Sequence, residues 1–124
     1  MNDLIRVLTI SQDEGLLESR AVLLQKAHYQ VQTATDYRQI QNIPDREDSE
    51  VAVLGQINPT SELDELTRLI RKRWPKTQIL ILSQVTPPLD DALYDERANA
   101  FHLEEFFAEV ARLAARSSIR ECSL

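Results

Sequence analysis

The chain has 124 residues, which suits one domain and leaves too little for two domains that each bury a core. The formal net charge of −6 argues against nucleic acid as a partner. The chain has only two glycines, Gly15 and Gly55, and they lie too far apart to form a glycine-rich phosphate loop. The lone cysteine suits a reducing compartment, and neither a signal peptide nor a membrane span is evident, so we expect a cytoplasmic protein without membrane association.

The first half of the chain alternates predicted strands and helices. Residues 4–10 (LIRVLTI) form a short apolar run typical of a buried strand. Ser11, with Glu14 three residues later, makes a capping-box pattern that opens a helix. The apolar stripe of that helix is Leu16, Leu17, Val22, Leu23 and Leu24. Residues 29–35 alternate as a second strand, after which Asp36 caps a short helical segment that Pro44 ends.

The same alternation continues through the second half. Residues 51–54 are a third strand, apolar on both faces and followed directly by Gly55. The next helix opens at residues 59–61, is stopped by Pro75, and places on one face Leu63, Leu66, Ile70 and Trp74. A fourth strand spans residues 79–82 and ends at Ser83. We then expect a loop over 85–89, a short helix from Asp90 or Asp91 to about Ala98, a brief fifth strand at 100–102, and a last helix over 103–116.

Strands alternate with helices, and the inner strands are apolar on both faces. This pattern predicts an α/β fold, a doubly wound parallel sheet with helices on both sides in three layers. We expect one domain over residues 1–117 and a C-terminal tail over 118–124. In such folds ligands bind beyond the carboxyl ends of the strands. Those ends carry Ser11-Gln12-Asp13, Thr35-Asp36, Gly55-Gln56, Ser83-Gln84 and His102-Leu103.

Nearly the whole chain, to about Arg116, resembles the response-regulator receiver domains of two-component signalling. The resemblance rests on the segments RVLTISQDEGLLESRAVLLQKAHYQVQTATD, SEVAVLGQINP, TQILILSQ and RANAF. The spacing of Pro59 after the third strand, Ser83 closing the fourth, and Ala98 before Phe101 are the better matches. The resemblance implies a flavodoxin-like, five-stranded parallel sheet with strand order 2-1-3-4-5.

The resemblance also implies where phosphorylation chemistry would lie. In the family, two acids after strand one hold Mg²⁺, an aspartate ending strand three accepts the phosphoryl group, and a lysine followed by proline ends strand five. Here the acids align with Ser11 and Gln12, the aspartate with Gly55, and the lysine with Glu104 or with a deletion. Ser83 and the aromatic Phe101 remain. We therefore expect a degenerate receiver with an uncharged pocket, no catalytic residue, no metal and no cofactor, rather than an enzyme.

The leading hypothesis is a phosphorylation-independent protein–protein interaction module in two-component-type signal transduction. In the resembling family, the fourth helix, fifth strand and fifth helix form the contact face, so we expect a signalling protein or a second copy, in a homodimer, to bind there. The candidate contact residues are Phe101, Phe106 and Phe107. Adjacent helix positions lie about 100° apart, so one of the last two should lie near an edge. The alternative is a small-molecule or anion sensor that uses the emptied pocket.

Three other features have competing interpretations. Asp13 and Glu14 could bind a metal, but carboxylates in a first helical turn favour the helix dipole. His28 and His102 have no partners at ligand spacing. A basic cluster at the end of the third helix could contact nucleic acid or an acidic partner, but it is more typical of a solvated helix end; it comprises Arg68, Arg71, Lys72, Arg73 and Lys76.

Overall fold

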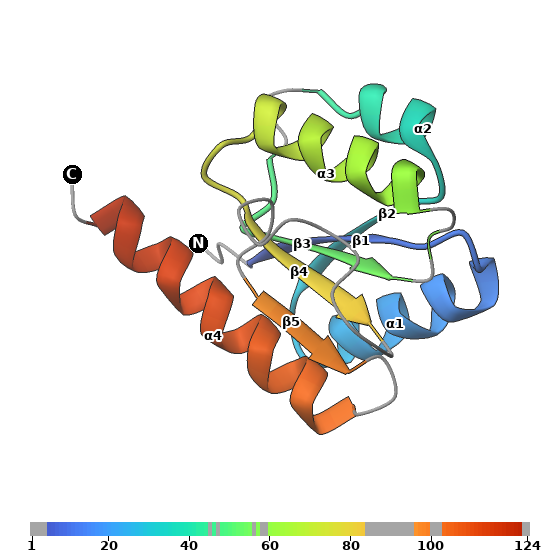
Figure 1. The fold of residues 1–124 in the computed structure, drawn as a ribbon. Helices are drawn as coiled ribbons and strands as arrows, with labels where there is room; N and C mark the ends of the chain where they lie inside the picture. Colours follow the sequence, from blue (N-terminus) through green and yellow to red (C-terminus); the bar gives the residue numbers. More distant parts are fainter. Residues whose placement is uncertain are drawn as a thin grey trace.

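The computed structural model describes residues 5–44, 46, 48–55, 57, 60–83, 96–99 and 103–122. Five parallel strands form one sheet with the order β2-β1-β3-β4-β5, as predicted. The strands are β1 (Arg6–Ile10), β2 (Gln30–Ala34), β3 (Val51–Gly55), β4 (Gln78–Ser83) and β5 (Glu96–Asn99). Figure 1 shows α1 (Glu14–Lys26) and α4 (Leu103–Cys122) on one side of the sheet, and α2 (Tyr37–Gln41) and α3 (Thr60–Arg73) on the other.

The two faces of the sheet bury two separate apolar clusters, because successive residues of a strand point to opposite faces. Towards α2 and α3, the cluster includes Leu8, Leu54 and Ile81 from the strands and the predicted stripe of α3, which is Leu63, Leu66, Ile70 and Trp74. Towards α1 and α4, it includes Val7, Val53 and Leu80 together with Leu24, Phe106, Val110 and Leu113. The prediction that the inner strands are apolar on both faces is confirmed for β1, β3 and β4.

The strand register brings the carboxyl ends of the central strands to one edge of the sheet. Ile10 of β1 lies opposite Leu54 of β3, and Gly55 lies opposite Leu82 of β4. The residues that follow β1 and end β3 are therefore neighbours at this edge. We call it the carboxyl edge, defined by Ser11, Gly55 and Ser83.

The start and the buried face of α1 differ from the prediction. The helix begins at Glu14 and its N-cap is Asp13, not Ser11. Its buried residues are Leu17, Arg20 and Leu24, whereas Leu16 and Val22 are exposed. The prediction selected every leucine and valine of the segment. The helix, however, can turn only one narrow stripe to the sheet, and here that stripe follows the spacing 17, 20, 24.

The last strand and helix also differ in extent. Residues 96–99 pair with β4 as β5, so the predicted helix to Ala98 is wrong over 96–98 and the fifth strand begins earlier than residue 100. The ladder uses backbone groups that every non-proline residue offers, so the polar sequence ERAN pairs without an apolar pattern. The rest of the predicted 90–98 helix, and residues 100–102, lie outside the described residues. α4 continues past the predicted end at Arg116 to Cys122, so residues 118–122 of the predicted tail are helical.

Among the described residues, no helix combines the length and the apolar character that a membrane crossing requires.

Candidate functional site

The predicted site residues at the carboxyl edge fall into two groups. Ser11 is fully buried, Gln12 is exposed, and Gly55 is the last residue of β3. Ser83 ends β4 and Glu104 lies in the first turn of α4, but their side chains are outside the described part of the structure, as is the whole of Phe101. The register therefore brings Ser11 and Gly55 together, as the receiver-like alignment implies.

The polar groups after β1 serve to start α1. The Ser11 N–H donates to the Ala34 carbonyl at 3.3 Å, and the Ser11 Oγ accepts from the Asp13 N–H at 3.1 Å. The Asp13 carboxylate in turn accepts from the Leu16 N–H at 3.1 Å, which is the bond of an N-cap. Glu14 follows in the first turn, where a carboxylate favours the helix dipole. The helix-start interpretation of Asp13 and Glu14 thus agrees with the structure.

Gly55 occupies a position with no space for a side chain. A Cβ added there would lie 2.9 Å from the Cβ of Leu82, closer than real Cβ contacts come, and 3.2 Å from Nη1 of Arg20. Leu82 belongs to the neighbouring strand, so its Cβ cannot move without moving the backbone of β4. Glycine is therefore required here by the close packing of β3, β4 and α1, in addition to lacking a group that could be phosphorylated.

The expectation of an uncharged pocket is wrong, because the Arg20 guanidinium lies at the end of β3. Arg20 is only 7% exposed, and its Nη1 has no hydrogen-bond partner among the described residues. Burial lowers the pKa of the Arg20 guanidinium, because desolvation disfavours the charged form, and attraction by the Asp13 carboxylate opposes this shift. Arginine nevertheless stays protonated in proteins. The carboxyl edge thus holds one buried positive charge that comes from α1.

Sequence reasoning missed Arg20 because a charged helical residue is usually on the solvated face. One feature of the sequence could have revealed that Arg20 is buried. Leu17, Arg20 and Leu24 are spaced three and four residues apart, which is the spacing of a single helix face. Arginine can lie on such a face when its aliphatic stem packs against apolar neighbours and its guanidinium reaches a polar edge.

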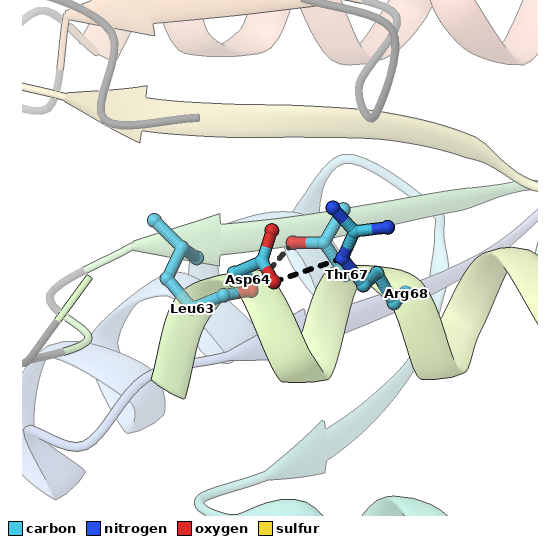
Figure 2. Close-up of polar contacts among 4 residues, drawn as sticks. All are labelled: Leu63, Asp64, Thr67 and Arg68. Carbon is cyan, nitrogen blue, oxygen red and sulfur yellow. Dashed lines mark hydrogen bonds and ion pairs between the residues drawn. The ribbon is translucent and has the colours of Figure 1, made fainter. Parts of the chain in front are cut away.

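Much of the basic cluster at the end of α3 is bound within the chain itself. Figure 2 shows Arg68 paired with Asp64 one turn earlier, at 2.8 Å, beside Thr67, whose hydroxyl donates to the Leu63 carbonyl. Arg71 donates to the Thr77 carbonyl, and Arg73 donates to two carbonyls at the end of α2 and lies over the Trp74 ring. Three of the five cationic side chains thus have intramolecular roles, as expected for the end of a helix.

The predicted contact face contains one buried and one half-buried phenylalanine. Phe106 is buried in the cluster under α4, whereas Phe107 only packs against its margin. Their ring centroids lie 5.3 Å apart with the planes tilted by 49°. The two rings therefore contact each other in a tilted arrangement. Of the two, Phe107 is the one at the edge of the cluster.

The described residues contain no group of three His, Cys, Asp or Glu side chains placed to hold a metal ion. His28 lies in the turn between α1 and β2 with a positive φ of 71°, which is a backbone role. His102 lies outside the described residues.

The sequence matches no protein-family model and no curated protein. Solved structures do resemble it. Response regulator TrrA of Thermotoga maritima, crystallised with Mg²⁺ and BeF, has a TM-score of 0.75 at 20% identity, covering 89% of this chain and 99% of that chain. The signal receiver domain of an HD domain-containing protein from Pseudomonas fluorescens has a TM-score of 0.81 at 14% identity, with coverage of 100% and 96%.

An adenylate cyclase structure from Rhodopirellula baltica has a TM-score of 0.83 at 16% identity, covering 97% of this chain and 94% of that chain. At such low identities, these likenesses establish the fold. The chain has the flavodoxin-like fold of response-regulator receiver domains.

Proposed function

We propose that this protein is a phosphorylation-independent signalling module with a receiver fold, which acts by binding a protein partner or a second copy of itself. The observation that carries the proposal is Gly55. The residue at the end of β3 has no side chain, and the packing of Leu82 leaves no space for one. A receiver that transfers a phosphoryl group needs a carboxylate nucleophile at that place.

The surroundings of Gly55 support the same conclusion. Ser11 and Gln12 stand where acidic residues would hold Mg²⁺, and a divalent cation needs several hard oxygen ligands. The nearest described carboxylate along the chain, that of Asp13, already caps α1. The cation at this edge is Arg20, which lies against Gly55 and would disfavour Mg²⁺ by charge repulsion.

The contact face that we propose lies along α4 and β5. β5 is the last strand of the sheet order and, among the described strands, pairs only with β4. A strand edge without a strand neighbour is a template for pairing with another chain. Phe107 lies half-buried on α4, which packs against β4 and β5. Aromatic residues at such margins often anchor interfaces, because they bury a large area with little loss of side-chain entropy.

Phosphorylation-independence is tested by treating the protein with acetyl phosphate and Mg²⁺ and measuring its intact mass. We expect no adduct of about 80 Da, while a phosphorylatable receiver domain treated in parallel gains one. The measurement should be made under native conditions within minutes, because acyl phosphates hydrolyse. A stable adduct of that mass on this chain would contradict the proposal, and peptide mapping would then show which side chain carries it.

A further inference from the structure

β2 is the first strand of the sheet order, and its outer side lies at the surface of the molecule. Among the described strands, β2 pairs only with β1. Gln30 and Thr33 are exposed, and Val31 and Gln32 are half-buried, so solvent reaches this strand on both of its faces. A strand in this position presents backbone N–H and C=O groups that a further strand can bind. We call this side of residues 30–34 the β2 edge.

The direction of the backbone groups in β2 follows from its ladder with β1. The Gln30 N–H donates to the Ile5 carbonyl, and the Ala34 carbonyl accepts from the residue that follows β1. In a strand, the N–H and C=O of one residue point to the same side, and successive residues alternate between the two sides. The even-numbered residues of β2 therefore bind β1, and Val31 and Thr33 direct their N–H and C=O groups outward.

The outward donors on either side of these two residues are already used. The Tyr29 N–H donates to a carbonyl of α1 at 3.1 Å, and the Thr35 N–H donates to Oε1 of Gln39 at 2.7 Å. The N–H groups of Val31 and Thr33 make no hydrogen bond to any of the residues that the structure describes. The available donors of the β2 edge are thus two N–H groups, two residues apart, within the strand itself.

The side chains of β2 do not oppose contact with another strand. Its sequence, QVQTA, contains no charged residue and no proline, which are common means by which edge strands avoid pairing with other chains. The net charge of −6 opposes close contact between two copies of this chain over much of the surface. Two copies that meet at β2 bring uncharged strands together, with donors facing acceptors.

The available groups fit an antiparallel pairing of two β2 strands about a twofold axis at Gln32. In that register Val31 of one copy lies opposite Thr33 of the other, and each such pair exchanges two hydrogen bonds. An axis at Val31 or Thr33 would place a donor opposite Tyr29 or Thr35, which lie outside the strand and use their own N–H groups elsewhere. Pairs of β-branched side chains such as valine and threonine are also favourable across strands.

We propose that a second copy of this chain binds at the β2 edge, by antiparallel pairing of the two β2 strands about Gln32, so that the two sheets become one. The backbone groups of Val31 and Thr33 hold the copies together. The surface is at the opposite end of the strand order from β5, so each copy keeps its α4 and β5 contact face for a different protein. The inference goes beyond the proposed function and does not depend on it.

The register is tested by cross-linking through a single introduced cysteine. Gln32→Cys is made together with Cys122→Ser, which removes the only natural cysteine. Opposite residues of a pair without hydrogen bonds have Cα atoms about 4.5 Å apart, a distance that a disulfide spans. Gln30→Cys in the same background is the matched control, because it would lie roughly 13 Å from its counterpart. Under mild oxidation we expect a disulfide-linked dimer from Gln32→Cys and monomer from Gln30→Cys.

Two kinds of variant test whether the β2 edge drives association, which analytical ultracentrifugation measures. Thr33→Pro removes an outward N–H that the ladder with β1 does not use. It should raise the dissociation constant of the dimer roughly tenfold to a hundredfold, since two hydrogen bonds are lost in each dimer. Gln32→Lys keeps the backbone donors and places like charges opposite each other, so it should also weaken association. Mixing Gln32→Lys with Gln32→Glu should restore it, a result that does not depend on how the proline variant folds.

The proposal is overturned if the wild type stays monomeric, if the two cysteine variants cross-link equally, or if the mixture of charged variants associates no better than its components. It is also overturned if Phe107→Gln abolishes association while Thr33→Pro and Gln32→Lys leave it unchanged, because the second copy would then bind at α4. None of these results affects the acetyl phosphate measurement, so the two proposals can fail separately.

Discussion

His28 has a backbone conformation that L-amino acids seldom adopt. Among the described residues it is the non-glycine residue with positive φ, at 71°. It follows the C-cap Ala27 of α1, and its N–H donates to the Gln25 carbonyl while the Tyr29 N–H donates to the Leu24 carbonyl. This pair of bonds is a Schellman motif, in which the residue at His28's position is usually glycine. The motif ends α1 and turns the chain into β2.

We therefore expect His28→Gly to stabilise the protein. Glycine removes the steric cost of the left-handed conformation, about 1–2 kcal/mol, and adds entropy to the unfolded chain, so the net gain should be about 0.5–1 kcal/mol. Urea unfolding followed by circular dichroism measures the difference. His28→Ala retains the steric cost and serves as the control, with little expected change. A less stable His28→Gly protein would show that the imidazole itself contributes a contact.

At the scale of elements, α2 depends on α3 for its position. α2 has five residues, which is too short for a helix to be stable by itself. Asp36 caps its N-terminus, and Arg73 from the end of α3 donates to the Ile40 and Ile43 carbonyls at its C-terminus. Arg73 thus adds a donor to the Ile40 carbonyl, which also accepts from the Ile43 N–H, and supplies one to the Ile43 carbonyl just beyond the helix. The guanidinium links two helices on the same face of the sheet.

Arg73→Gln should loosen α2 and lower the free energy of unfolding by about 1–2 kcal/mol, since two charge-assisted bonds at a partly exposed site are lost. Hydrogen exchange should accelerate at the amides of α2 more than at those of β3, because only α2 loses its C-terminal support. Lys72→Gln, at the exposed neighbouring position, is the matched control and should change stability by less than about 0.5 kcal/mol. Equal effects of the two substitutions would show that the carbonyl contacts are unimportant.

At the scale of the whole molecule, the proposed contact face lies at one end of the sheet. Among the described strands β5 pairs only with β4, and α4 is a 20-residue helix that lies along this side. In Figure 1 the C-terminal turns of α4, in red, extend beyond the ends of the strands. The last strand of the sheet order next to a long helix is the arrangement from which the proposed contact face follows.

If a second copy binds this face, the wild type should associate as its concentration rises, and Phe107→Gln should weaken that association by tenfold or more, roughly the effect of losing an aromatic anchor. Light scattering coupled to size-exclusion chromatography reports the mass. Leu16→Gln, which removes an exposed apolar side chain from α1, is the control and should associate normally. A wild type that stays monomeric at all concentrations would exclude self-association, and the proposed partner would then be a different protein.

Much of the architecture was predictable from local patterns. The apolar inner strands and the stripe of α3 matched, because each pattern repeats with the period of its own element. The cap Asp36 also matched, whereas α2 ends at Gln41, earlier than the predicted end at Pro44. The site was predictable only in part. Alignment placed Ser11 and Gly55 at one edge, but the capping role of Asp13 and the burial of Arg20 depend on the rotation of α1 over the sheet. The extent of β5 likewise depends on pairing with β4 rather than on its own residues.

The sequence by itself determined which segments bury apolar surface and that no carboxylate ends the third strand, because hydrophobic period and residue identity are local properties. Only the tertiary structure decided that Leu82 closes the space at Gly55 and that Arg20 brings a positive charge to it. Those facts arise where three elements distant in the sequence meet, and their distances follow from how closely the helix and the strands pack.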